Sequence, residues 1–189
     1  PPQLNRRQRQ MCIRDRFCNQ GIAELGDRLG PIFWQFMATK KFDADEFEAF
    51  IEMLPRQWQG VGLRHAVDVR HESFICPEFV ALMRKHGVAI VCPDSDKFLQ
   101  IADQTADFSY ARLMRCREDI DTGYSAAELD HWAHVAQSWY GGAQPDGLDY
   151  AADASAKLAK KRDVFMFFIS GAKVRAPAAA SALTQRLEQ

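Results

Sequence analysis

The chain has 189 residues, of which 47% are hydrophobic, a composition that can bury one sizeable core and predicts a single soluble domain. Lys and Arg total 24 and Asp and Glu total 25, so net charge gives no general attraction to nucleic acid or to an anionic membrane. The five cysteines form no C-x-x-C pair, which argues against a disulfide framework and a structural zinc site. The longest apolar run, at residues 164–169, is too short to span a bilayer, and no signal-peptide pattern is seen, so a cytoplasmic location is expected.

The first 20 residues are expected to lie outside the fold. Residues 1–16 contain five arginines and one acid, without an apolar period that would give them a buried face. We interpret residues 1–20 as a tail that is either disordered or an artefact of gene prediction from a truncated sequence. A basic arm that holds phosphates is the alternative. The domain itself is expected to cover residues 21–189.

Short apolar runs alternate with segments of helical spacing along the rest of the chain, a pattern typical of βα units with a parallel sheet. The first helix is expected at residues 21–29, where Gly30 stops it, and a strand follows at 32–36. Asp43 predicts the cap of the next helix, which Pro55 ends.

A second strand is predicted at 64–69, and a helix then begins at Pro77 and ends before Gly87, the usual asymmetry of helix ends. Two further strands are expected at 88–92 and 108–113.

Ser125 and Glu128 form the pattern of a capping box, which opens a helix that ends at Gly141. The elements expected after it are a loop at 143–153, a short helix at 154–161, a fifth strand at 164–169 and a last helix at 177–187. Five such strands fit either an open doubly wound sheet or part of an eight-stranded barrel. No G-x-G-x-x-G or P-loop sequence follows any of them, so a nucleotide-binding Rossmann fold has no support.

Four segments carry a resemblance to a known family. They are Leu-Gly-Pro-Ile-Phe-Trp-Gln-Phe at 29–36, Arg-His-Ala-Val-Asp-Val-Arg-His-Glu-Ser-Phe at 64–74, Val-Ala-Ile-Val-Cys-Pro-Asp-Ser at 88–95 and Thr-Ala-Asp-Phe-Ser-Tyr-Ala-Arg-Leu at 105–113. In this order they resemble the motifs of the YecE-like family, domain of unknown function 72 (DUF72). The resemblance implies an α/β fold, a partial TIM-type (β/α) barrel whose five parallel strands correspond to the fourth to eighth strands of the family barrel. It also implies an N-terminally truncated fragment, because such barrels run to about 250 residues.

The chain departs from the family pattern at two strand ends. Leu113-Met114-Arg115 stands where the family commonly has Leu-His-Gly, so a histidine role at that position does not carry over. The Asn-Asn-Asp that often follows the last strand is replaced at residues 169–173, which indicates a divergent subgroup.

Candidate site residues come from the alternation of side chains along strands. Asp68 and Arg70 share one face and lie toward the C-terminal mouth, where barrel active sites form. Arg112 and Asp94 lie late on their own strands, and Gln35 ends the first. These groups together suit an anionic or polyhydroxyl ligand. The alternative is a structural polar plug in which acids and arginines only neutralise one another.

The candidate catalytic residues are Asp68 and Asp94. The candidate substrate-binding residues are Gln35, Arg70, Arg112, Ser170, Gly171 and Lys173. The last three belong to the turn after the final strand, where many barrels bind phosphate through backbone N–H groups, with an ordinary strand-to-helix loop as the alternative. No metal site is predicted, because His131 and His134 lie three apart on a helix without a third ligand.

The leading functional hypothesis is an enzyme of unassigned chemistry that acts on a small anionic or phosphate-bearing substrate at the barrel mouth. The alternative is a non-catalytic barrel that binds a ligand or nucleic acid. The near-zero net charge argues against nucleic acid without excluding it. The sequence does not identify a cofactor or an oligomeric state.

Overall fold

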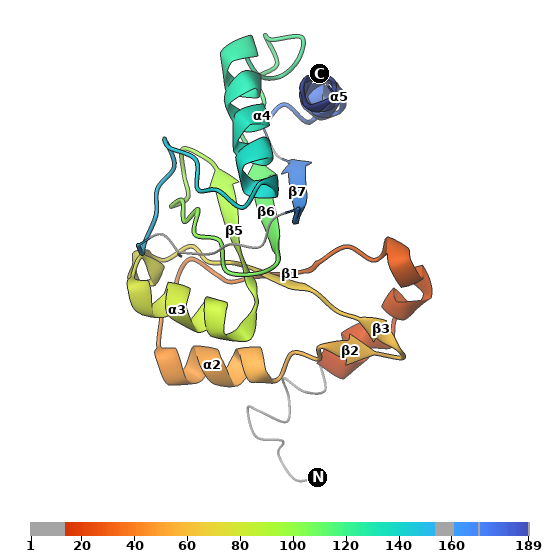
Figure 1. Cartoon of the computed structure of the whole chain (residues 1–189), viewed down its shortest axis with the longest axis vertical. Coiled ribbons are helices and arrows are strands. Elements are labelled where there is room, and N and C mark those ends of the chain that lie inside the picture. Colours follow the sequence, from red (N-terminus) through yellow and green to blue (C-terminus); the bar gives the residue numbers. More distant parts are fainter. Residues whose placement is uncertain (1–13, 154–160, 170, 189) are drawn as a thin grey trace.

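The protein is described by a computed structural model that covers residues 14–153, 161–169 and 171–188. Its centre is a five-stranded parallel sheet in the order β1-β4-β5-β6-β7, which is also the order along the chain. The strands are β1 (Ile32–Gln35), β4 (His65–Asp68), β5 (Ala89–Asp94), β6 (Phe108–Leu113) and β7 (Asp163–Phe168). The sheet is not closed into a barrel, since β1 and β7 form its two edges (Figure 1). The predicted five parallel strands are confirmed.

Helices flank the sheet in two pairs. The α-helices are α2 (Ala44–Glu52), α3 (Pro77–His86), α4 (Ala126–Tyr140) and α5 (Ala176–Leu187), and the 3-10 helices are η1 (Ile22–Arg28), η2 (Glu72–Phe74) and η3 (Lys173–Arg175). In Figure 1, α2 and α3 lie together at one end of the molecule, and α4 and α5 lie together at the other. Within the described ranges, no helix has the length and apolar character needed to cross a membrane.

All four α-helices cover the same face of the sheet. Val67 and Ile90 pack with residues of α2 and α3, while Ala111 and Leu113 pack with residues of α4 and α5. The strand residues of opposite parity form a separate cluster that includes no residue of these helices. It consists of Ala66, Ala89, Val91, Phe108 and Tyr110, with Phe33, Ala106 and Phe165 packed against it. A doubly wound sheet, which needs helices on both faces, is therefore excluded.

Local signals in the sequence fix the helix ends. The Asp43 side chain accepts a hydrogen bond of 2.8 Å from the Glu46 backbone N–H at the start of α2. Ser125 and Glu128 form the predicted capping box of α4. Gly87 ends α3 with φ of 62°, a left-handed conformation that glycine adopts without a steric cost.

The first helix differs from the prediction. It is a 3-10 helix rather than a regular α-helix, and Gly26 interrupts it with φ of 54° and ψ of −124°. A two-stranded antiparallel hairpin that the pattern did not predict follows α2, with strands β2 (Gln57–Trp58) and β3 (Val61–Gly62). Its turn places Gln59 and Gly60 at positive φ, as the two-residue turns of hairpins do. Strands of two residues are too short to produce a recognisable hydrophobic period.

Part of the segment assigned to the tail packs on the domain. Residues 14–18 are helical, and Cys18 is buried. The Phe17 ring lies 5.7 Å from that of Trp34, and Arg14 Nη1 donates a hydrogen bond of 2.7 Å to the Met53 carbonyl. Residues 1–13 lie outside the described residues, as does the predicted short helix at 154–161 except for Lys161.

Candidate functional site

Four of the predicted site residues meet on the helix-free face of the sheet, at the C-terminal ends of the strands. Gln35 ends β1 and stands in register with Asp68, which ends β4. Arg70 lies two residues beyond Asp68, and Arg112 comes from β6. Because the strands are parallel, all of their C-terminal ends lie at the same end of the sheet, and the side chains converge there. We call Gln35, Asp68, Arg70 and Arg112 the rim cluster.

Asp68 is the centre of the rim cluster. Its side chain is only 2% exposed, and its two oxygens accept from Arg70 Nη2 at 2.9 Å and from Arg70 Nε at 3.3 Å. Arg112 Nη1 donates to the same Asp68 oxygen as Arg70 Nη2 does. Gln35 Oε1 accepts from Arg70 at 3.3 Å and from Arg112 at 3.2 Å. One carboxylate and one amide oxygen thus hold two guanidiniums side by side.

Each of the two guanidiniums also lies over an aromatic ring in a cation–π contact. The Arg70 Cζ atom lies 3.6 Å from the centroid of the Phe98 ring, and the Arg112 Cζ atom lies 4.6 Å from that of Phe33. The Arg70 and Arg112 side chains are 11% and 17% exposed. Arg70 Nη1 and the Nε and Nη2 groups of Arg112 make no hydrogen bond to a described residue. The rim cluster therefore has two cations for one anion, with N–H groups to spare.

Asp94 does not join the rim cluster. Along β5, Val91 belongs to the helix-free cluster and Cys92 to the helix-facing core, so alternation assigns Asp94 to the parity of Cys92. Its Oδ1 lies 3.3 Å from Arg115 Nε, whereas its Oδ2 is buried and has no hydrogen-bond partner among the described residues. Burial raises the pKa of Asp94, and the charge of Arg115 opposes that rise only in part.

A pocket of about 550 Å³ lies beside Asp94, at the C-terminal end of β5 and the start of α4. Arg115, Trp132 and His131 line it, together with Phe98. Phe98 therefore belongs both to this pocket and, through its stacking on Arg70, to the surroundings of the rim cluster.

In the turn after β7, the described residues Gly171 and Lys173 make no hydrogen bond to the rim cluster. Ser170 lies outside the described residues. Gly171 has φ of 64°, and a Cβ atom there would lie 2.5 Å from the Cys116 carbonyl oxygen, so close backbone packing accounts for the glycine. Lys173 begins η3 and is exposed. These contacts are those of an ordinary loop, and phosphate binding at this turn stays a prediction.

The histidines near β4 have structural partners. Trp34 Nε1 donates to His65 Nδ1 at 3.1 Å, and His65 Nε2 lies 2.8 Å from the Pro55 carbonyl, which fixes the buried ring in its neutral form. Burial accordingly lowers the pKa of His65. The Ser73 backbone N–H donates to His71 Nδ1 at 3.1 Å at the start of η2. Over the residues that the structure describes, no group of three or more His, Cys, Asp or Glu side chains is placed to hold a metal ion.

Sequence reasoning missed the two ring partners of the rim cluster. Phe33 has the strand parity of Gln35, so alternation was a signal that could have identified it. Phe98 lies in the segment after β5, where no periodicity indicates the direction of a side chain. Its contact with Arg70 follows only from the path of that loop.

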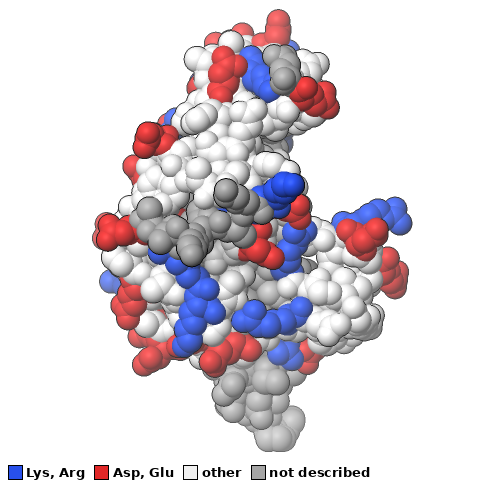
Figure 2. Space-filling view, viewed as in Figure 1, with Lys and Arg blue, Asp and Glu red and all other residues white. Residues whose placement is uncertain are grey.

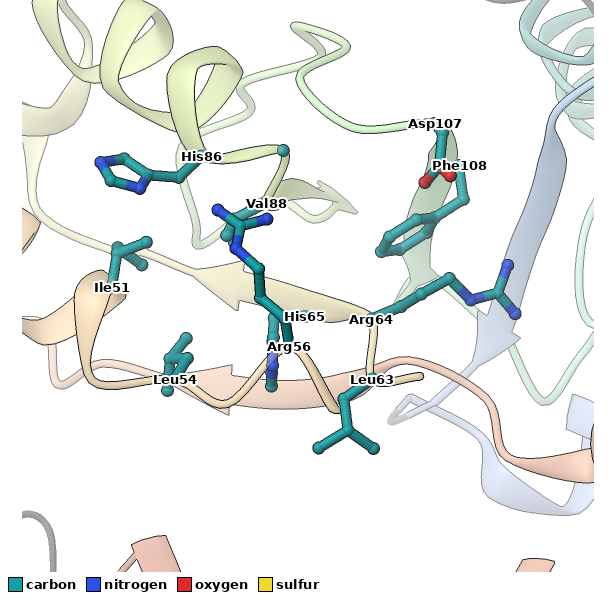
Figure 3. A pocket seen from close by; sticks show the side chains of 11 residues that line it. Ile51, Leu54, Arg56, Leu63, Arg64, His65, His86, Val88, Asp107 and Phe108 are labelled. Atoms are coloured by element: carbon teal, nitrogen blue, oxygen red, sulfur yellow. The ribbon is translucent and has the colours of Figure 1, made fainter. Parts of the chain in front are cut away.

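Another pocket lies at the opposite, N-terminal end of the strands. It has a volume of about 380 Å³ and is lined by side chains from α2, α3 and the beginnings of β4 and β6 (Figure 3). Arg64 extends from it toward β7, where its Nη1 lies 2.5 Å from Asp163 Oδ2. This pocket and the rim cluster share no residue.

Comparison with known proteins identifies the family. The chain belongs to the family described as protein of unknown function DUF72, whose family model matches residues 3–189. It is similar to the crystal structure of a DUF72 family protein from Thermotoga maritima, with a TM-score of 0.60 and 20% identity over 93% of this chain and 64% of that one. A DUF72 family protein from Enterococcus faecalis gives a TM-score of 0.58 and 12% identity over 86% and 60% of the two chains. The chain thus spans less than two thirds of the length of either. A comparison with curated proteins found no match.

Proposed function

Starting from its place in a family of unknown function, we propose that this protein binds a small anionic substrate, bearing a carboxylate or phosphate group, at the rim cluster. The observation that carries the proposal is the surplus of charge, since Arg70 and Arg112 share the single carboxylate of Asp68. An anion placed against the free N–H groups would balance the second guanidinium and accept charge-assisted hydrogen bonds.

Asp68 has a positioning role in this proposal. Both of its oxygens accept hydrogen bonds from guanidiniums, and its side chain is almost fully buried, which suits a group that orients the two arginines. It aligns the two cations in advance, which reduces the conformational entropy lost when an anion binds.

Asp94 is the better candidate for acid–base chemistry. Burial raises its pKa, which is the direction that a general acid needs, and it lines a pocket together with the ring that stacks on Arg70. A substrate anchored by its anionic group at the rim cluster would extend past Phe98 to reach it. We therefore propose an enzyme with Arg70 and Arg112 as substrate-binding residues and Asp94 as general acid; a binding protein without catalysis is the alternative.

The nucleic-acid alternative has less support. Figure 2 shows acidic side chains beside and around the basic ones over the face that it draws. A continuous basic surface, which binding along a phosphate backbone requires, is not seen among the coloured residues of that face.

The experiment is a titration with inorganic phosphate and with malonate at constant ionic strength, followed by calorimetry and by the melting temperature. Saturable binding is expected in wild type. Arg70→Ala and Arg112→Ala should each weaken it by about tenfold or more, the effect of losing charge-assisted hydrogen bonds worth about 1.5–3 kcal/mol. Arg28→Ala is the matched control, since Arg28 is exposed on η1 and should leave binding unchanged.

The proposal fails if neither anion raises the melting temperature of wild type while both rim substitutions unfold the protein. That outcome would make the rim cluster a purely structural polar core. Binding that survives both substitutions would also overturn it, because the anion would then lie elsewhere.

A further inference from the structure

A buried arginine that forms no ion pair with a described residue lies at the opposite end of the strands from the rim cluster. Arg162 directly precedes β7 and is 3% exposed. Its Nη2 donates to the carbonyl oxygens of Ala106 and Phe108, at the beginning of β6. Its Nε and Nη1 atoms are buried and have no hydrogen-bond partner among the residues that the structure describes.

This arrangement is costly as it stands. A guanidinium stays protonated in proteins, and a buried charge or N–H group without a partner loses its hydration with no compensation. Burial lowers the pKa of Arg162, and the charge of Asp107 opposes this only in part. Asp107 is exposed and makes no hydrogen bond to Nε or Nη1, so it leaves both groups unsatisfied.

Arg162 is one of the residues that line a pocket of about 370 Å³ between α4, α5 and the beginning of β7. Its walls are Ala136, Gln137, Tyr140, Arg162, Val164 and Leu187. The carboxylate of Asp163, which also borders it, is already paired with Arg64. Tyr140 and Leu187 are 53% and 41% exposed, so an aromatic and an aliphatic side chain are left uncovered here. The pocket thus combines apolar walls with one amide and one unsatisfied cation.

We propose that this pocket is a binding site for a small carboxylic acid with an apolar body, separate from the rim cluster. The carboxylate would accept from Nε or Nη1 of Arg162, and the body would lie against Tyr140 and Leu187. Because Nε and Nη1 are buried, binding would require side chains that line the pocket to move, and Tyr140 and Leu187 are the partly exposed ones. A monoanion suits the site better than phosphate, since it balances one cation and leaves no further charged oxygens against apolar walls.

The test uses benzoate as the probe, with benzyl alcohol as its neutral counterpart and inorganic phosphate as an anion without a ring. Calorimetry and ligand-observed NMR on the whole chain should show saturable binding of benzoate, at least about tenfold tighter than that of benzyl alcohol, because only benzoate forms charge-assisted hydrogen bonds. Phosphate should not compete with benzoate.

Arg162→Met should weaken benzoate binding by about tenfold or more, which is the loss of about 1.4 kcal/mol or more. Tyr140→Ala should weaken it several-fold, and Arg28→Ala should leave it unchanged. Tyr140 is half exposed, so its variant folds even where Arg162→Met does not, and it tests the pocket independently. Absence of saturable benzoate binding in wild type overturns the proposal, as does binding that Tyr140→Ala leaves intact. Phosphate binding at the rim cluster should persist in Tyr140→Ala, which keeps the two proposed sites distinguishable.

Discussion

Substitution of Asp68 should destabilise the protein more than substitution of either arginine that it binds. Asp68 accepts hydrogen bonds from both Arg70 and Arg112, so Asp68→Ala leaves two guanidiniums together with only the Gln35 amide oxygen between them. Removing one partner of a buried ion pair costs about 3–5 kcal/mol, and here two cations lose the same partner. In Arg112→Ala, by contrast, Asp68 keeps its two hydrogen bonds from Arg70. That loss is about 1.5–3 kcal/mol.

The assay is equilibrium unfolding in urea, followed by tryptophan fluorescence. Urea is uncharged, so it does not screen the ion pairs under test, as guanidinium chloride would. Acetate should restore part of the stability of Asp68→Ala by binding between the two guanidiniums, in proportion to the logarithm of its concentration at saturation. The control is Asp27→Ala, since Asp27 is exposed on η1 and should change little. If Arg112→Ala costs as much as Asp68→Ala and acetate restores nothing, Asp68 is not the centre of the cluster.

Two further substitutions test the protonation of Asp94 and the packing of the turn after β7. Because burial raises the pKa of Asp94, the native state holds this proton to higher pH than the unfolded chain does, so stability falls as pH rises from the ordinary carboxyl range through the raised pKa. The melting temperature of Asp94→Asn relative to wild type should therefore increase with pH over that window, and a decrease measured by calorimetry would contradict the assigned shift. Gly171→Ala should lower stability by about 1–2 kcal/mol from the left-handed backbone alone, and by more because its Cβ would lie 2.5 Å from the Cys116 carbonyl oxygen. Gly62→Ala, where a Cβ meets nothing within 4 Å, is its control; equal melting temperatures for the two variants would refute the account.

The strands could be predicted because strands covered on both sides read as nearly continuous apolar runs. Residues 88–92, Val-Ala-Ile-Val-Cys, are the clearest example, and they overlap β5. The starts of two helices could be predicted from single capping residues, Asp43 and Ser125, whose side chains accept a backbone N–H hydrogen bond. The exception is the first helix, where one glycine at position 26 interrupts a segment whose apolar spacing is helical. Spacing reports which face is buried, but it does not report where the backbone turns.

The rim cluster could be predicted as far as strand alternation reaches. Asp68 and Arg70 share parity within one segment, and the parallel order of the strands brings Gln35 and Arg112 to the same edge. Asp94 shows the limit of that reasoning. It lies at the C-terminal end of its strand, as the rim residues do, but its side chain is on the same face as that of Cys92, which packs with the helices. Position at a strand end does not identify a member of the cluster, because a shift of one residue moves a side chain to the other face.

The sharing of Asp68 also determines how the rim cluster can be tested. In a one-to-one buried pair, loss of the arginine would leave an uncompensated carboxylate, and any loss of binding would be confounded with unfolding. In this protein either arginine can be removed while the other still holds Asp68, so the carboxylate keeps a partner in both single variants. Each single substitution then removes the second positive charge of the rim cluster. A structural plug does not need that charge, but anion binding does. Anion affinity should consequently fall in Arg70→Ala and in Arg112→Ala under conditions in which both variants remain folded. An unchanged anion affinity in the folded variants would mean that the two arginines serve the fold alone.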